Sequence, residues 1–277
     1  MPAIFAIPII VVIIGFLIAR LLMYFGRRAQ EQKVAVFYET KHQVFDYQLS
    51  QYNLYYKSLD MTGRDRFLRR VVEFMESKDF QYIDIQAEEL MPLLISSAAI
   101  QLTFGLDKYL LDHFTTIYLL KDNYRYGLYN TPFEGHVSEE GIYLSWTNFL
   151  REFSDYSDGQ NVGLHEMAHA LVYVNFTAEE GVDQTFHDRF RDFSSVGRPI
   201  FDGMQGEPTL PGTAAISLLG AYAATNYQEF WAVCVETFFE RPVAFKKQIP
   251  TLYLALCTLL NQDPLTPAKI LDSIVTN

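Results

Sequence analysis

The sequence contains little cysteine, with two residues among 277, which excludes a disulfide-stapled scaffold. It also lacks an excess of basic side chains: 22 Lys and Arg stand against 33 Asp and Glu, giving a net charge of −11. Recognition of nucleic-acid phosphates needs the opposite balance, so we expect no nucleic-acid partner. With 49% hydrophobic and 15% aromatic residues, the chain is too apolar to be disordered. Internal repeats and low-complexity linkers are absent as well.

The N-terminus lacks charge, because residues 2–19 carry no ionisable side chain. About 20 apolar residues suffice to cross a bilayer as a helix. No Lys or Arg precedes this run and Arg27 and Arg28 follow it, which favours an anchor over a cleaved signal peptide. The positive-inside rule places the rest of the chain in the cytoplasm. We therefore expect residues 1–28 to be a transmembrane helix of a single-pass protein of the inner (cytoplasmic) membrane.

Beyond residue 28, the hydrophobic pattern predicts mainly helices with a small β-sheet, an α+β class. Residues 29–60 are expected to form a helical connector, and residues 61–277 a single domain. β-branched and aromatic residues predict strands at 115–120 and 141–146, separated by a loop over 121–136. Helical spacing of apolar residues predicts the helices of the domain at 67–78, 87–106, 160–174, 185–195, 214–224, 227–240, 249–261 and 266–275.

Residues 165–169 form the pattern H-E-x-x-H. On a helix, positions i and i+4 share a face, so the imidazoles of His165 and His169 can bind one metal ion. Glu166 lies nearby and can accept a proton from a water that the metal activates. The alternative is a buried helix with two incidental histidines. The turn before the segment and its apolar neighbours favour a helix that binds a metal.

Catalytic zinc needs a third protein ligand and an open position for water. The metzincin third histidine is missing, because residue 175 is Asn. Glu236 lies two turns beyond Glu229 on the same side of a helix, where it can hydrogen-bond a ligand histidine. A buried carboxylate such as Glu229 needs a partner, which a metal would supply. From the residues alone, several candidates for the third ligand remain open, with Glu229 and His187 ranked level: Glu179, Glu180, Asp183, His187 and Glu229.

Several segments together resemble the MtfA (Mlc titration factor A) family of zinc metallopeptidases, small gluzincins related in their catalytic core to anthrax lethal factor. The segments are GIYLSW (141–146), DGQNVGLHEMAHAL (158–171), GEPTL (206–210), YAATNYQEFWAVCVETFFERP (222–242) and PTLYLALCTLLNQDP (250–264). Two positions depart from the family pattern: Met167 and Trp231 replace phenylalanines, and both changes are expected to leave the chemistry intact. The apolar N-terminus is absent from the soluble family members.

The resemblance implies a gluzincin-like metallopeptidase domain with a zinc ion. It implies that His165, His169 and Glu229 are the zinc ligands. It further implies that Glu166 is the general base and that Tyr222 donates a hydrogen bond to the oxyanion of the tetrahedral intermediate, as a phenol near the metal can.

We therefore expect a membrane-anchored zinc peptidase that hydrolyses peptide or protein substrates. The alternative is a non-catalytic or weakly catalytic protein that sequesters a regulatory, transcription-factor-like partner at the membrane. A structural zinc site is disfavoured, because such sites usually have four protein ligands. The strand over 141–146 is expected to form an edge beside the cleft, where an extended peptide can add to it. His136 lies close to this strand and is a candidate substrate contact.

Overall fold

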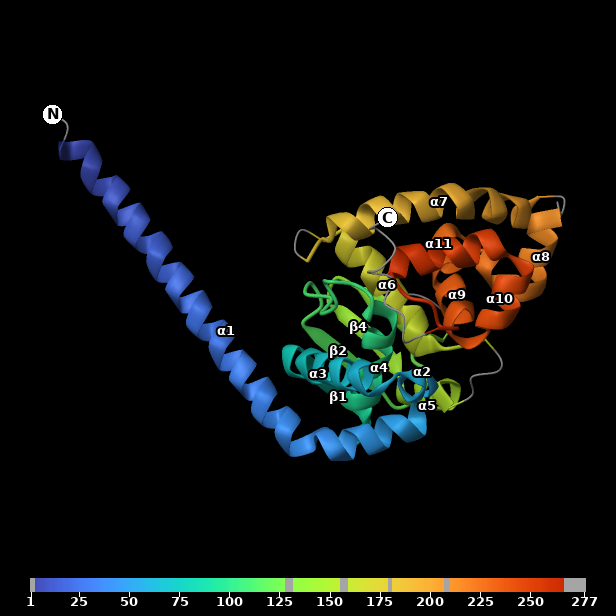
Figure 1. The fold of residues 1–277 in the computed structure, drawn as a ribbon, viewed down its shortest axis with the longest axis horizontal. Helices are drawn as coiled ribbons and strands as arrows, with labels where there is room; N and C mark the ends of the chain where they lie inside the picture. Colours follow the sequence, from blue (N-terminus) through green and yellow to red (C-terminus); the bar gives the residue numbers. More distant parts are fainter. Residues whose placement is uncertain (1–2, 128–131, 155–158, 179–180, 207–209, 267–277) are drawn as a thin grey trace. The chain divides into compact units, whose positions relative to one another are not determined.

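The computed structural model describes residues 3–127, 132–154, 159–178, 181–206 and 210–266 (Figure 1). The chain divides into two compact units, Met1–Gln43 and Val44–Asn277. Helix α1 (Ala3–Tyr52) makes up the described part of the first unit and continues into the second. The division of the remaining chain into a connector over 29–60 and a domain over 61–277 stays a prediction.

A membrane span was tested for in the described part of the N-terminal helix. Among the residues described in side-chain detail, no helix has an apolar stretch long enough to cross a bilayer. The predictions of a transmembrane helix over residues 1–28 and of a single-pass inner-membrane location were therefore wrong. From Val11 on, where the side chains of α1 are described, Arg20, Arg27 and Arg28 interrupt the apolar residues, so no described apolar run reaches the about 20 residues that a span requires.

The second unit contains a four-stranded mixed sheet in the order β1-β2-β4-β3. The strands β1 (Asp79–Ile83), β2 (Thr116–Leu120) and β4 (Gly141–Ser145) are parallel, and β3 (Gly135–Ser138) runs antiparallel to β4. The prediction that the strand over 141–146 forms the edge was wrong, because β4 lies between β2 and β3. The edge strand next to β4 is β3, which begins inside the segment predicted to be a loop.

The other regular elements described in this unit are helices, and two of them, α5 and α10, were not predicted. The helices are α2 (Leu54–Ser58), α3 (Met61–Ser77), α4 (Leu90–Thr103), α5 (Trp146–Ser154), α6 (Val162–Phe176), α7 (Gln184–Gln205), α8 (Leu210–Leu219), a 3-10 turn η1 (Tyr222–Ala224), α9 (Tyr227–Glu240), α10 (Pro242–Gln248) and α11 (Pro250–Leu260). All but the first residue of the helix predicted at 266–275 lies outside the described residues.

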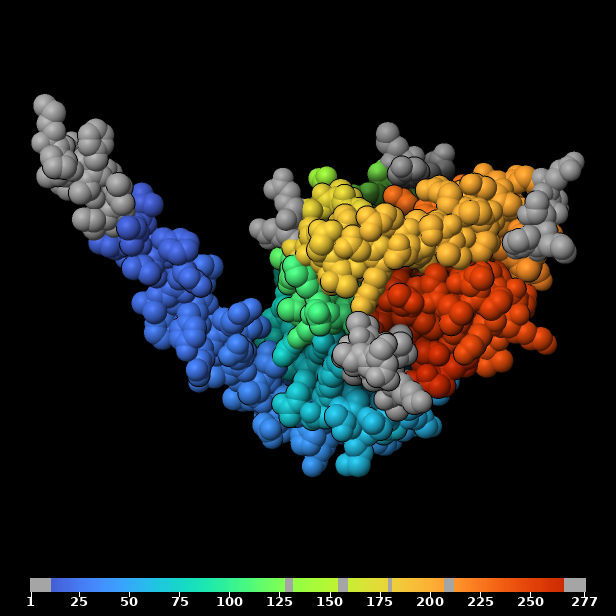
Figure 2. Space-filling model, turned by 45° about the horizontal axis from the view of Figure 1, so that its top comes forward, coloured from blue at the N-terminus to red at the C-terminus, as the bar shows by residue number. Residues whose placement is uncertain are grey.

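Helix α6 has a central place in this unit. It packs against α4, α9 and the strands β3 and β4. Helix α7 packs on α8 and α11, and Figure 2 shows α7, in gold, beside the red surface of the C-terminal helices. The packing of α6 brings the H-E-x-x-H segment next to both the edge strand and α9.

Candidate metal centre

The H-E-x-x-H segment lies within α6, as predicted. The helix begins after Asn161, whose side chain accepts a hydrogen bond from the Leu164 amide at 3.0 Å, a usual N-cap contact. Leu164, Met167 and Ala168 are fully buried and fix the face of α6 that packs on the core. The side chains of His165 and His169 keep 13% and 20% of their surface exposed, so both open toward a cleft.

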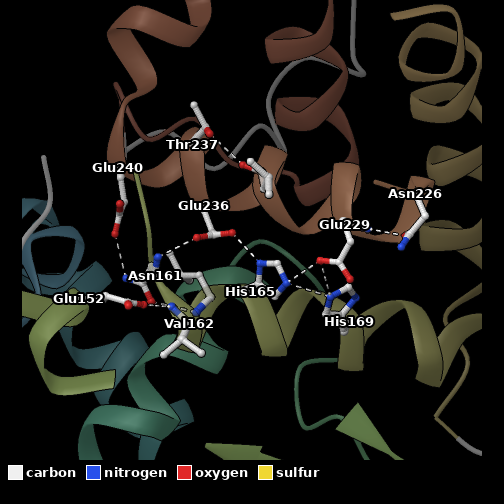
Figure 3. A network of polar contacts seen from close by, with 12 residues as sticks. Glu152, Asn161, Val162, His165, His169, Asn226, Glu229, Glu236, Thr237 and Glu240 are labelled. Atoms are coloured by element: carbon white, nitrogen blue, oxygen red, sulfur yellow. Dashed lines mark hydrogen bonds and ion pairs between the residues drawn. The ribbon is translucent and has the colours of Figure 1, made fainter. Parts of the chain in front are cut away.

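Glu229 reaches the same cleft from α9. The Asn226 side chain caps this helix by accepting from the amides of Gln228 and Glu229 at 2.9 and 3.0 Å. The carboxylate of Glu229 therefore stands in the first turn, where the helix dipole favours negative charge. Figure 3 shows Glu229 and Glu236 pointing from α9 toward His165 and His169 on α6.

Three ligand atoms converge in this cleft. His165 Nε2 lies 3.0 Å from Glu229 Oε2 and 3.0 Å from His169 Nε2, and His169 Nε2 lies 3.6 Å from Glu229 Oε2. Bonds of about 2.0–2.1 Å to a tetrahedral zinc ion place its ligand atoms about 3.3 Å apart. Within the described part of the chain, these three side chains are the group of His, Cys, Asp or Glu arranged to hold a metal ion. The spacing and the chemistry of these three side chains therefore suit the binding of one metal ion.

The other candidates for the third ligand have different roles. Asp183 caps α7 by accepting hydrogen bonds from the amides of Thr185 and Phe186. His187 binds the backbone carbonyl of Asn175 through Nε2. Glu179 and Glu180 lie outside the described residues. The structure thus brings Glu229, and neither Asp183 nor His187, to the two histidines.

Glu236 orients one of the histidines. Its Oε1 lies 2.6 Å from His165 Nδ1, and its Oε2 accepts the Asn161 amide at 2.7 Å. A carboxylate on Nδ1 fixes the ring and leaves Nε2 free to bind a metal. Burial alone would lower the pKa of His165, but the hydrogen bonds to Glu229 and Glu236 outweigh it and raise that pKa.

The sequence reasoning missed a further buried carboxylate at the start of α6. Glu152 on α5 is 4% exposed, and its Oε2 accepts the Val162 amide at 2.8 Å. Burial raises its pKa. A second carboxylate, Glu240, accepts from the Asn161 side chain at 3.0 Å. Carboxylates at a helix N-terminus are stabilised by its unpaired amides and dipole. The sequence signal was weak, because Glu152 lies on another helix.

Glu166 and Tyr222 complete the cleft. Glu166 is 5% exposed, burial raises its pKa, and among the described residues no donor binds its buried Oε2. Tyr222, in η1, is 60% exposed, and its ring centroid lies 6.2 Å from that of His165. Partial burial, with the nearby Glu229 carboxylate, raises the pKa of Tyr222.

Two hollows meet at these residues, with volumes of about 290 and 580 Å³. Both are lined by His165, Glu166, Tyr222 and the edge residue Gly135. His136 lines the smaller hollow, but its ring stacks on Tyr143 with centroids 4.3 Å apart. A substrate contact by His136 stays a prediction.

Comparison with known proteins identifies the family of this chain. The model of the glucose-regulated metallo-peptidase M90 family matches residues 27–260, so the chain belongs to this metallopeptidase family. Mlc titration factor A of Cronobacter sakazakii is 30% identical over 132 residues, 48% of this chain and 49% of that protein. The protein of the same name from Yersinia enterocolitica is 33% identical over 136 residues, 49% of this chain and 50% of that protein.

The chain thus spans about half the length of the curated relatives it matches. The resemblance to the MtfA family is confirmed. A metallopeptidase family implies a metal ion, which His165, His169 and Glu229 can bind.

Trp231, which stands where the family has a phenylalanine, makes a hydrogen bond that a phenylalanine cannot make. Its indole Nε1 donates to the Ala168 carbonyl at 2.9 Å and joins α9 to α6 between the two histidines. We expect Trp231→Phe to lower the free energy of unfolding by about 2 kcal/mol through the lost hydrogen bond and volume. The substitution should also weaken metal binding about tenfold, the size of effect seen when a group that supports the metal ligands is lost. Denaturation and zinc titration measure both effects, and Trp146→Phe controls for the lost volume. A Trp231→Phe variant equal to the parent would show that the contact is dispensable.

Proposed function

We propose that this protein is a zinc-dependent peptidase that hydrolyses peptide bonds in peptide or protein substrates. The convergence of His165, His169 and Glu229 beside Glu166 carries this proposal. Two imidazoles and one carboxylate are a ligand set of catalytic zinc sites that keep a position open for water. The family to which the chain belongs supports the same conclusion.

When bound, zinc would polarise the scissile carbonyl and lower the pKa of a bound water toward about 7. Glu166, buried beside the ligands with Oε2 free among the described residues, would accept the proton of the attacking water. It would then pass this proton to the leaving amine. Tyr222, whose raised pKa keeps it protonated, would donate its phenolic hydrogen to the oxyanion.

A second candidate function is the binding of a regulatory protein. It is favoured by the name of the curated relatives, which describes them as titration factors for Mlc. In this case the site would have weak catalytic activity or none, and the protein would act by sequestering its partner. An intact set of metal-binding and proton-transferring side chains favours the peptidase, because binding alone does not need Glu166 and Tyr222.

The two functions separate in one experiment on the full chain. Purified protein is dialysed, its metal content is determined by mass spectrometry, and a broad peptide library is incubated with it. We expect about one zinc per chain and cleavage that a chelator stops and added zinc restores. Stoichiometric zinc without cleavage of any peptide would contradict the peptidase and favour the binding protein. Protein that binds no zinc would contradict both the ligand set and the mechanism.

Glu236→Gln tests how the zinc ligand His165 is oriented. The amide of Gln has a single acceptor oxygen, so it cannot accept from both Asn161 and His165 as the carboxylate does. We expect zinc affinity to fall about 10–100-fold, measured by competition with a chromogenic chelator. Glu240→Gln is the matched control, since Glu240 lies on the same helix and binds the Asn161 side chain. Equal affinities of the two variants would contradict a role for Glu236 in orienting the histidine.

A further inference from the structure

The residue at which the edge strand β3 meets Glu166 is a glycine, which has no side chain. Gly135 is the first residue of β3 and pairs with Leu144 of β4. Residues opposite each other across two strands point to the same face of a sheet. A side chain at position 135 would therefore point to the face on which Leu144 is fully buried, and α6 packs against both strands.

The space for such a side chain is already occupied. A Cβ atom added to Gly135 would lie 2.6 Å from Glu166 Cγ, 2.8 Å from its Oε1 and 2.9 Å from its Cδ. Non-bonded carbon atoms prefer separations of about 3.5–4.0 Å. All three close neighbours belong to one side chain, and that side chain is the one beside the metal ligands.

The backbone conformation does not explain this glycine. Among the described residues, glycines with positive φ include Gly141 and Gly159, but not Gly135. An alanine could adopt the backbone of Gly135 without strain, so what the position excludes is the Cβ atom. Glu166 is the flexible partner in the contact, and an added methyl group would displace its carboxylate before it moved the strand.

We propose that Gly135 is a positioning residue for Glu166. The bare backbone of the edge strand packs against the Glu166 side chain and holds its carboxylate where the two hollows meet. The packing stands on geometry alone, and its consequence for catalysis rests on the proposed function. Gly135 touches Glu166 and acts through it.

A double-mutant cycle tests the packing without any activity measurement. Gly135→Ala, Glu166→Ala and the double variant are compared as metal-free full-length proteins by urea denaturation. We expect Gly135→Ala to lower the denaturation midpoint of the parent but not that of Glu166→Ala, because alanine at 166 removes all three contacted atoms. Gly206→Ala measures the intrinsic effect of the substitution, since its nearest neighbour would lie 3.9 Å away. Equal effects of Gly135→Ala in both backgrounds would overturn the proposal.

Kinetics test the positioning role. We expect Gly135→Ala to keep its zinc and its KM while kcat falls about 100-fold, the effect of an ångström-scale displacement of a reacting group. A kcat equal to that of Gly206→Ala would overturn the positioning role. If the parent cleaves no peptide, the proposed function fails, whereas the cycle still decides whether Gly135 and Glu166 are packed as described.

Discussion

Glu166→Gln is expected to lower kcat for peptide hydrolysis by about 10²–10⁴-fold while the protein keeps its zinc. Gln has the size of Glu, so the buried site keeps its packing, but the amide cannot accept a proton. General acid–base catalysis accounts for rate factors of this size. The three ligand atoms belong to other residues, and therefore metal content should stay at the parent value. Stopped assays on a quenched fluorescent peptide, with metal analysis of the same samples, measure both quantities.

The matched control for this experiment is Glu134→Gln. Glu134 also lines the larger hollow, but its side chain is 46% exposed. If loss of negative charge in the cleft were enough to reduce activity, both variants would be slow. We expect Glu134→Gln to keep a kcat close to that of the parent. A Glu166→Gln variant as active as Glu134→Gln would show that another group moves the proton, or that the activity comes from a contaminant.

Helix α6, which contains the H-E-x-x-H segment, was the most predictable part of the fold. Its apolar residues recur at helical spacing, an asparagine stands at its N-cap, and the two histidines follow at i and i+4. These signals are local, so one stretch of sequence contains them all. The helix observed at Val162–Phe176 agrees with the one predicted at 160–174.

The position of Glu229 beside the two histidines was not predictable from local signals. Glu229 comes from another helix, and its approach to His165 and His169 depends on how α9 packs on α6. Before the family resemblance was considered, His187 was an equal candidate. Only the tertiary structure shows that His187 binds a backbone carbonyl instead. The same limit applies to Glu152, whose partner is an amide ten residues away on α6.

The sheet was only partly predictable. Strand β2 has β-branched and aromatic residues and was expected, but β3 is Gly-His-Val-Ser, which is short and weakly β-forming. Its place is set by the hairpin with β4 rather than by its composition. Missing this strand assigned the edge to β4. The significance of Gly135 could not be seen either, since its contact with Glu166 exists only after β3 and α6 have packed.

Glu229→Ala is expected to weaken zinc binding by at least about 100-fold, the upper range for loss of a residue that only supports a ligand, because Glu229 is proposed to bind the ion directly. Two imidazoles from one helix would remain, without the carboxylate that balances the charge of the ion. In the metal-free protein, the pKa of Glu229 is lowered, since hydrogen bonds to His165 and His169 outweigh its burial. The carboxylate is therefore ionised and available at neutral pH. Competition with a chromogenic chelator gives the affinity.

Gln228→Ala controls for damage to α9. Its backbone amide is bound by the same Asn226 side chain as that of Glu229, so both variants keep the helix cap. Gln228 also lines the smaller hollow, and its replacement removes a polar side chain without removing a carboxylate. We expect Gln228→Ala to bind zinc like the parent and Glu229→Ala to lose both zinc and activity. If Glu229→Ala instead held zinc as tightly as Gln228→Ala, the third ligand would have to be a different residue, and the arrangement of α9 against α6 would need another explanation.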